Sequence, residues 1–156
     1  CTLGFGADAI VASVAVGPEG QVTGSESQPL IETVVGYGLA HFKAENWPIQ
    51  EAMRGIRTVC ADAFDYLKEQ PDDSVDVVYF DPMFRHPLLE SRSLSPLRTV
   101  ANHEPVSEAM IEEACRVARR RVVFKENARS LEFERLGFTK IMGGRYSKVH
   151  YGVRIL

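Results

Sequence analysis

The sequence predicts an α/β protein: a Rossmann-like, doubly wound, mainly parallel sheet with helices on both faces and a C-terminal antiparallel hairpin. Runs typical of strands alternate with runs of helical spacing along the 156 residues. A glycine turn at Gly4 and Gly6 leads directly into an apolar, alanine-rich segment. Only residues 143–148 separate the last two predicted strands, which suits a hairpin and is too short for a parallel crossover.

The first predicted helix covers 8–16, and a Gly-Pro-Glu-Gly turn ends it. A short strand over 21–25 follows and ends at Glu26. A helix over 29–42 is expected next, because proline suits its first turn and its apolar residues keep helical spacing. Residues 45–54 are predicted to be a polar connector with room for one further helical turn.

A strand over 56–60 ends close to Asp62. A helix over 64–69 follows, with Asp62 or Ala63 near its N-cap position. The apolar run 75–80 comes after a Pro-Asp-Asp-Ser turn and is predicted to be the central buried strand.

Residues 81–104 contain several prolines and little periodicity, which is typical of a long loop that is either functional or disordered. A helix over 107–118 begins at Ser107, which can cap it. The remaining predicted elements are strands over 121–125, 138–142 and 149–155 and a short helix over 130–136.

The composition is that of an ordinary globular chain, with 45% apolar residues, 25% charged residues and a net charge of −3. Because no apolar run approaches the roughly 20 residues of a membrane-spanning helix, no membrane association is expected. The three cysteines are widely spaced without a C-x-x-C pair, so neither a disulfide framework nor a zinc site is predicted. A cytoplasmic protein is the simplest interpretation.

Nucleotide-binding glycine turns normally follow a strand, and none precedes Gly4. We therefore expect 1–156 to be a single domain that lacks its natural N-terminus and the first strand of its sheet.

The glycine turn fits the pattern G-x-G-x-x-A, in which the backbone approaches a ligand at a helix N-terminus. Glu26 follows about 20 residues later at a strand end, where a carboxylate can accept both ribose hydroxyls. This pair fits NAD and S-adenosylmethionine equally well, and the glycines alone could simply allow a turn. Asp62 ends another strand, where it could accept from an adenine amino group or cap the next helix.

The tetrapeptide Asp81-Pro82-Met83-Phe84 follows a strand and carries the strongest functional signal. A carboxylate is costly to bury there without partners, and it can accept hydrogen bonds from an amine. Pro82 fixes the turn, and Phe84 offers a flat face for a planar ring. Taken with the glycine turn at Gly4 and Gly6, the tetrapeptide predicts methyl transfer to an exocyclic amine of a nucleobase. Asp81 could also be a structural turn residue, and Phe84 a core residue.

Cationic side chains accompany this segment and are candidates for contacts with RNA phosphates or the substrate pocket. Three lie in the predicted loop and one at a strand end: Arg85, His86, Arg98 and Lys125. The histidines of the loop have too few neighbouring ligands to predict a metal site.

In these residues the chain resembles class I S-adenosylmethionine-dependent methyltransferases. Segment 3–8 is similar to the family's first motif, Glu26 to its ribose-binding acid and Asp62 to its adenine-contacting acid. Asp81-Pro82-Met83-Phe84 resembles the fourth motif of amino-group methyltransferases, with Met83 in place of a second proline. The string 78–86 and the later strand 122–125 are closer to one subgroup, the bacterial small-subunit ribosomal RNA guanine-N2-methyltransferases.

The resemblance implies a sheet of order 3-2-1-4-5-7-6, S-adenosylmethionine as the cofactor and RNA, with ribosomal RNA favoured, as the partner. It implies that Asp81 and the Pro82 carbonyl orient the amine while Phe84 stacks on the base. The residues that it implies for cofactor binding are Leu3, Gly4, Gly6, Asp8, Glu26, Asp62 and Ala63.

Three alternatives stay open. The amine could be guanine N2, adenine N6 or another. The protein could instead be an NAD-type oxidoreductase that shares the glycine turn, against which the Asp81 tetrapeptide and the terminal hairpin argue. It could also be a non-catalytic RNA-binding or assembly protein that retains the fold.

Overall fold

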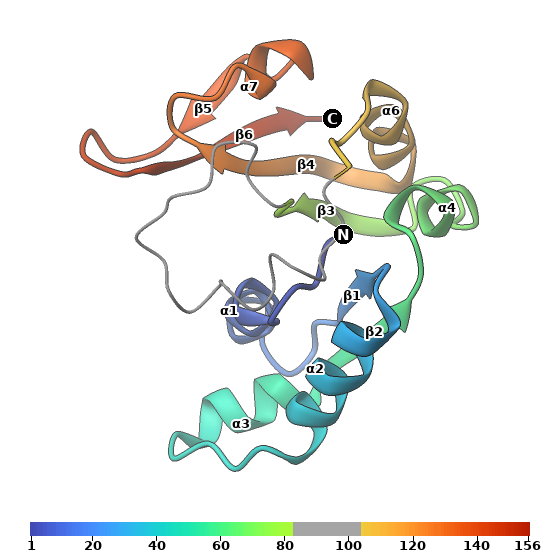
Figure 1. The fold of residues 1–156 in the computed structure, drawn as a ribbon, viewed down its shortest axis with the longest axis vertical. Helices are drawn as coiled ribbons and strands as arrows, with labels where there is room; N and C mark the ends of the chain where they lie inside the picture. The colour runs from blue at the N-terminus through green and yellow to red at the C-terminus, as the bar shows by residue number, and fades with distance from the viewer. Residues whose placement is uncertain (83–103) are drawn as a thin grey trace.

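The computed structural model describes residues 1–82 and 104–156 (Figure 1). The helices are α1 (Ala7–Val16), α2 (Pro29–His41), α3 (Trp47–Arg54), α4 (Ala63–Lys68), α6 (Glu108–Val117) and α7 (Glu132–Arg135). The strands are β1 (Val22–Glu26), β2 (Ile56–Cys60), β3 (Val75–Phe80), β4 (Ala118–Asn127), β5 (Lys140–Met142) and β6 (Val149–Ile155). The predictions for Phe84, Arg85, His86 and Arg98 lie outside the described residues.

The described strands form two sheets and not the single predicted one. β1 and β2 pair in parallel, and a second sheet has the order β3-β4-β6-β5. The N-terminal residues lie between the sheets: the Leu3 N–H donates to the Ser25 carbonyl oxygen (2.8 Å), and the Cys1 nitrogen donates to that of Tyr79 (2.9 Å). The predicted order 3-2-1-4-5-7-6 is therefore not confirmed, because among the described residues no strand lies between β1 and β3 to join the two sheets.

The predicted terminal hairpin is confirmed. β5 and β6 pair antiparallel, with Met142 opposite Tyr151, and β6 also pairs antiparallel with β4. β3 and β4 are parallel, with Phe80 opposite Phe124. The carboxyl ends of β3 and β4 therefore point toward the same edge as the β5–β6 turn (Figure 1).

β4 begins earlier and ends later than the predicted strand, α7 and β5 are shorter than predicted, and two further elements differ in kind or burial. The polar connector contains the eight-residue helix α3, because the Asn46 side chain accepts from the Ile49 N–H (3.3 Å) and a proline occupies its first turn. β3 is less buried than predicted, since Val75 and Val77 are 38% and 45% exposed. The reason is that β3 lies at the edge of the four-stranded sheet.

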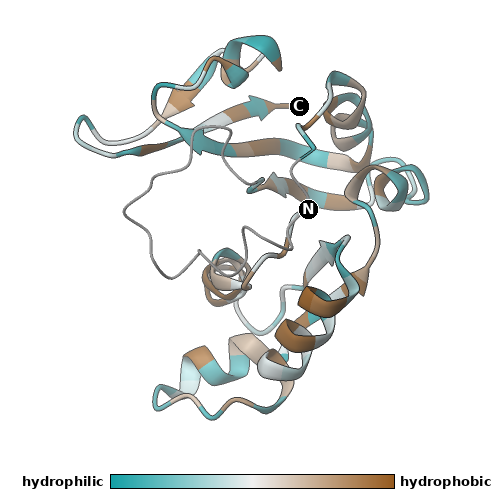
Figure 2. Ribbon diagram, viewed as in Figure 1, coloured by the Kyte–Doolittle hydropathy of each residue, from teal (hydrophilic) through white to brown (hydrophobic). Residues whose placement is uncertain are grey.

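The main core lies on one face of the four-stranded sheet. Alternate residues of β3 and β4, among them Phe80 and Phe124, point to this face and are covered by α4, α6 and α7. Phe124 stacks on Phe138 at 5.6 Å between ring centroids and meets Phe133 edge-on at 5.8 Å. Figure 2 shows apolar residues along β3 and β4 and hydrophilic ones at the β5–β6 turn. The intervening residues of β3 and β4 point to the opposite face, where Tyr79 and Lys125 meet α1.

No helix among residues 1–82 and 104–156 combines the length and apolar character needed to cross a membrane.

Candidate cofactor and substrate site

Polar residues from three strands and one helix meet near the carboxyl ends of the strands. Asp81 follows β3 directly, Lys125 lies near the end of β4, and Glu26 ends β1. Asp8 lies in the first turn of α1, directly after the glycine turn. In open α/β sheets, ligands bind at this edge.

One cation joins two carboxylates in this site. Lys125 Nζ donates to Asp8 Oδ2 at 2.7 Å and to Asp81 Oδ2 at 3.1 Å. The Tyr79 hydroxyl donates to the same Asp8 oxygen at 2.6 Å. The Lys125 side chain is 18% exposed, whereas those of Asp8 and Asp81 are 35% and 29% exposed. The cluster is therefore partly desolvated, and its two carboxylates are more exposed than its cation.

The surroundings shift the pKa values of Asp8 and Asp81 in opposite directions. Burial, followed by the charge of Asp8, raises the pKa of Asp81 to about 6, although Lys125 acts in the opposite direction. Burial would also raise the pKa of Asp8, but hydrogen bonds from Lys125 and Tyr79 lower it below its ordinary value. Asp8 is therefore the stronger acid of the two, and the pKa of Asp81 lies closer to neutral pH.

Lys125 stays protonated between them. Burial would lower its pKa, but hydrogen bonds and charges from Asp8 and Asp81 raise it overall. Burial, together with the neighbouring Asp8, raises the pKa of Tyr79, so that its hydroxyl keeps its proton and remains a donor.

The glycine turn is tied to the end of β1 by Glu26. Glu26 Oε2 accepts from the Gly4 N–H (3.1 Å), and Oε1 accepts from the Gln28 N–H (3.0 Å). Gly4 and Gly6 have φ of +53° and +79°, the left-handed region that favours glycine. Each oxygen of a carboxylate has two lone pairs, so Glu26 keeps acceptor capacity for a ribose hydroxyl. An acid held against a left-handed turn at a helix N-terminus fits a nucleoside cofactor.

Asp62 is the cap of α4, as one of its two interpretations predicts. Its Oδ1 accepts from the N–H groups of Phe64 (2.8 Å) and Asp65 (3.2 Å), and Ala63 is the first helical residue. Both bonds use the same oxygen, so capping does not prevent Oδ2 from accepting a hydrogen bond from a ligand.

Sequence reasoning missed Tyr79 and Thr2. Tyr79 belongs to a run interpreted as apolar. Its neighbours Val78 and Phe80 point into the core, so by alternation Tyr79 points to the opposite face of β3, where its hydroxyl reaches Asp8. That alternation could have revealed it. Thr2 Oγ1 accepts from the Asp81 N–H (3.0 Å), and no sequence pattern indicated this contact.

Replacing Lys125 by methionine is expected to lower the free energy of unfolding by about 2 kcal/mol at pH 7, the scale of hydrogen bonds to charged groups. The variant leaves Asp8 and Asp81 without their shared cation. The loss should shrink at about pH 4, where Asp81 is protonated and where Asp8, whose pKa Lys125 no longer lowers, can also take up a proton. Urea denaturation at both pH values measures this, with Lys140→Met on exposed β5 as the control. An equal loss at both pH values would contradict the electrostatic explanation.

Together, the strand-end acids and the glycine turn define a Rossmann-like α/β protein of the kind that binds a nucleoside cofactor. Residues 1–140 match the family described as putative SAM-dependent methyltransferase. The chain belongs to this family, whose cofactor is S-adenosylmethionine.

The chain is also similar to one uncharacterized protein and to several proteins named as methyltransferases. The uncharacterized protein YpiP of Bacillus subtilis is 45% identical over 98% of this chain and 59% of its own length. The ribosomal RNA small subunit methyltransferase J of Thioalkalivibrio sulfidiphilus is 30% identical over 83% of the chain and 51% of its own length. That of Pseudomonas fluorescens strain Pf0-1 is 28% identical over 80% of the chain and 47% of its own length. The chain thus spans about half the length of these relatives.

Proposed function

We propose that the protein transfers a methyl group from S-adenosylmethionine to an exocyclic amine of a nucleobase in RNA, with guanine N2 of small-subunit ribosomal RNA as the target. The observation that carries this is the link from Asp81 through Lys125 to Asp8, which stands at the start of the helix after the glycine turn. Asp81, which can orient an amine, is thereby linked to the helix start that follows the glycine turn proposed to bind the cofactor. The names of the methyltransferase J relatives support RNA as the acceptor.

In this proposal Asp81 orients the acceptor. Its carboxylate and the Pro82 carbonyl accept the two amine hydrogens, so that the nitrogen lone pair, otherwise delocalised into the ring, points at the methyl group. The cofactor supplies an electrophilic methyl group on a sulfonium centre. Lys125 holds Asp81 in place. As the N–C bond forms, the S–C bond breaks and the sulfonium becomes a neutral thioether. The methylated nitrogen then releases one proton to solvent, so no strong base is required and the contribution of the protein is orientation and electrostatics. Phe84, Arg85, His86 and Arg98 are proposed as substrate contacts on sequence alone.

The proposed cofactor site follows the strand ends. Leu3, Gly4 and Gly6 provide the turn, and Glu26 accepts the ribose hydroxyls. Asp62 and Ala63 lie at the start of α4, where they would contact the adenine. Asp8 lies in the first turn of α1, next to the proposed cofactor position, and its carboxylate accepts hydrogen bonds from Lys125 and Tyr79.

We also propose that 1–156 forms one domain with the strand order 3-2-1-4-5-7-6. Its support is the position of the first three residues, which hydrogen-bond to β1 on one side and to β3 on the other. A strand at this position would join the two described sheets.

The rate of methyl transfer is expected to fall with decreasing pH below about 6. The pKa of Asp81 is raised, so below about pH 6 its carboxyl gains a proton and loses the negative charge with which it accepts its amine hydrogen and pairs with Lys125. The expected profile of kcat/KM falls about tenfold per pH unit below this pKa and is level above it. Initial rates with tritiated S-adenosylmethionine measure it. A level profile from about pH 5 to about pH 8 would show that the carboxylate form of Asp81 is not required.

Calorimetry and a transfer assay test the function as a whole. We expect the natural full-length protein to bind S-adenosylmethionine and not NADH, and to transfer tritium to small ribosomal subunits from a strain that lacks its gene. NADH binding would favour an oxidoreductase. Cofactor binding without transfer to any RNA would favour a non-catalytic RNA-binding or assembly protein.

A further inference from the structure

The turn between β5 and β6, residues 143–148, lies beyond the site edge of the sheet. Lys125 pairs with Tyr151 and Asn127 with Val149, so the chain before Val149 continues past the end of β4. Figure 1 shows this turn projecting outward past the carboxyl ends of β3 and β4, the ends that carry Asp81 and Lys125. A long substrate that places its acceptor amine at Asp81 can therefore also contact this turn.

Hydrogen bonds close the turn and hold its tip. The Ser147 N–H donates to the Gly144 carbonyl oxygen (2.9 Å), and the Ser147 hydroxyl donates to that of Val149 (2.6 Å). Arg145 and Tyr146 are thus the two central residues of a closed four-residue turn. Because the backbone is already ordered, their side chains are presented to a partner at little entropic cost.

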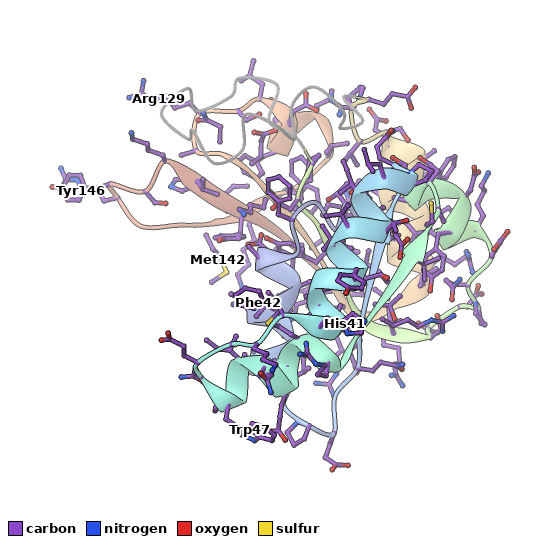
Figure 3. All side chains as sticks on the ribbon, turned by 60° about the horizontal axis from the view of Figure 1, so that its bottom comes forward. His41, Phe42, Trp47, Arg129, Met142 and Tyr146 are labelled. Atoms are coloured by element: carbon purple, nitrogen blue, oxygen red, sulfur yellow. The ribbon has the colours of Figure 1, made fainter. Side chains whose placement is uncertain are left out.

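The tip combines an aromatic ring with cations. Tyr146 is 89% exposed, and the Arg145 guanidinium carbon lies 5.7 Å from its ring centroid. The Ala128 N–H donates to the Lys148 carbonyl oxygen (3.0 Å), which keeps the following residue, Arg129, next to the hairpin. Figure 3 shows Tyr146 and Arg129 projecting outward on the same side of the molecule.

The charge of this region differs in sign from that of the whole chain. Residues 143–148 contain no Asp or Glu, and their Lys and Arg residues are Arg145 and Lys148. The net charge of the whole chain is −3. A local basic patch with an exposed ring is the combination with which proteins bind unpaired RNA, by stacking on bases and neutralising phosphates.

We propose that the 143–148 turn, together with Arg129, docks the RNA substrate beside the transfer site. Tyr146 stacks on an unpaired base, and Arg145 and Arg129 contact phosphates of the flanking nucleotides. This inference rests on the proposed function and extends it, because it assigns part of the RNA-binding surface.

Binding and turnover of paired variants test this docking surface. The double variant Arg145→Ala/Tyr146→Ala is compared with Arg57→Ala/Tyr37→Ala, which removes the same residue types from exposed positions of β2 and α2. The probe is an unmodified small-subunit ribosomal RNA transcript, bound to the full-length protein at several salt concentrations. Turnover is measured on small ribosomal subunits from the deletion strain.

The turn variant is expected to raise the Kd for RNA about tenfold or more, to raise KM more than it lowers kcat, and to leave the Kd for S-adenosylmethionine unchanged. Loss of one cation should lower the slope of log Kd against log salt by about 0.7. Tyr146→Phe should keep wild-type binding, and the control pair should be neutral. Unchanged RNA affinity and salt slope in an active turn variant would overturn the docking surface alone. Absence of RNA methylation by the wild-type protein would overturn the proposed function and the docking surface together.

Discussion

Replacing Asp81 by alanine is expected to lower methyl transfer about 10²–10³-fold, the range found when one group that stabilises a transition state is removed. The acceptor amine loses the carboxylate that orients its hydrogens. The Kd for S-adenosylmethionine should stay within about threefold of the wild-type value, because Asp8 keeps its bonds to Lys125 and Tyr79. Single-turnover rates and calorimetry on the same preparation measure the two quantities.

Asp81→Asn is the matched variant. It retains the size of the side chain and one oxygen acceptor, so it should recover part of the activity, and its residual rate should lose the pH dependence near 6. Equal losses of cofactor affinity and rate in the alanine variant would place Asp81 in the cofactor site instead.

Replacing Glu26 by alanine is expected to raise the Kd for S-adenosylmethionine about 10–100-fold. The variant removes the ribose acceptor, and hydrogen bonds to charged groups contribute about 1.5–3 kcal/mol. It also leaves the N–H groups of Gly4 and Gln28 without their acceptor. The bond from the Leu3 N–H to the Ser25 carbonyl oxygen then remains as the tie between the glycine turn and β1. Isothermal titration calorimetry measures the affinity.

Two variants separate binding from folding. Glu26→Gln keeps an acceptor and should bind better than the alanine variant. Ser25→Ala lies on the same strand and removes a buried hydroxyl that has no hydrogen-bond partner among the described residues, so it should leave stability and affinity unchanged. An unaltered Kd in a folded Glu26→Ala protein would show that Glu26 only supports the turn.

The sequence predicted most of the strands and their ends because alternation, turn residues and caps are local signals. Examples are the acid that ends β1, the cap of α4 and the antiparallel pairing of β5 with β6. Contacts between distant parts of the chain were not visible. The bond from Tyr79 to Asp8 joins positions 71 residues apart, and that from Lys125 to Asp8 joins positions 117 apart. No local pattern encodes such a meeting.

The division into two sheets could not be predicted for a related reason. Strand patterns indicate which residues are extended, whereas pairing depends on which strands lie side by side. The sequence predicts only a polar connector with room for one helical turn where helix α3 forms. Most residues of α3 are polar or exposed, and its two buried residues, Ala52 and Met53, are too few to give a clear helical pattern. Lys125 was placed near the substrate from its position at a strand end, but its role between two carboxylates required the geometry of α1.

The most direct measurement of the central claim is nucleoside mass spectrometry of small-subunit ribosomal RNA from a strain that lacks the gene. We expect N2-methylguanosine to fall by one residue per subunit, to return with the wild-type gene and not to return with a gene carrying Asp81→Ala. An unchanged nucleoside profile, or full restoration by the Asp81→Ala gene, would contradict the account.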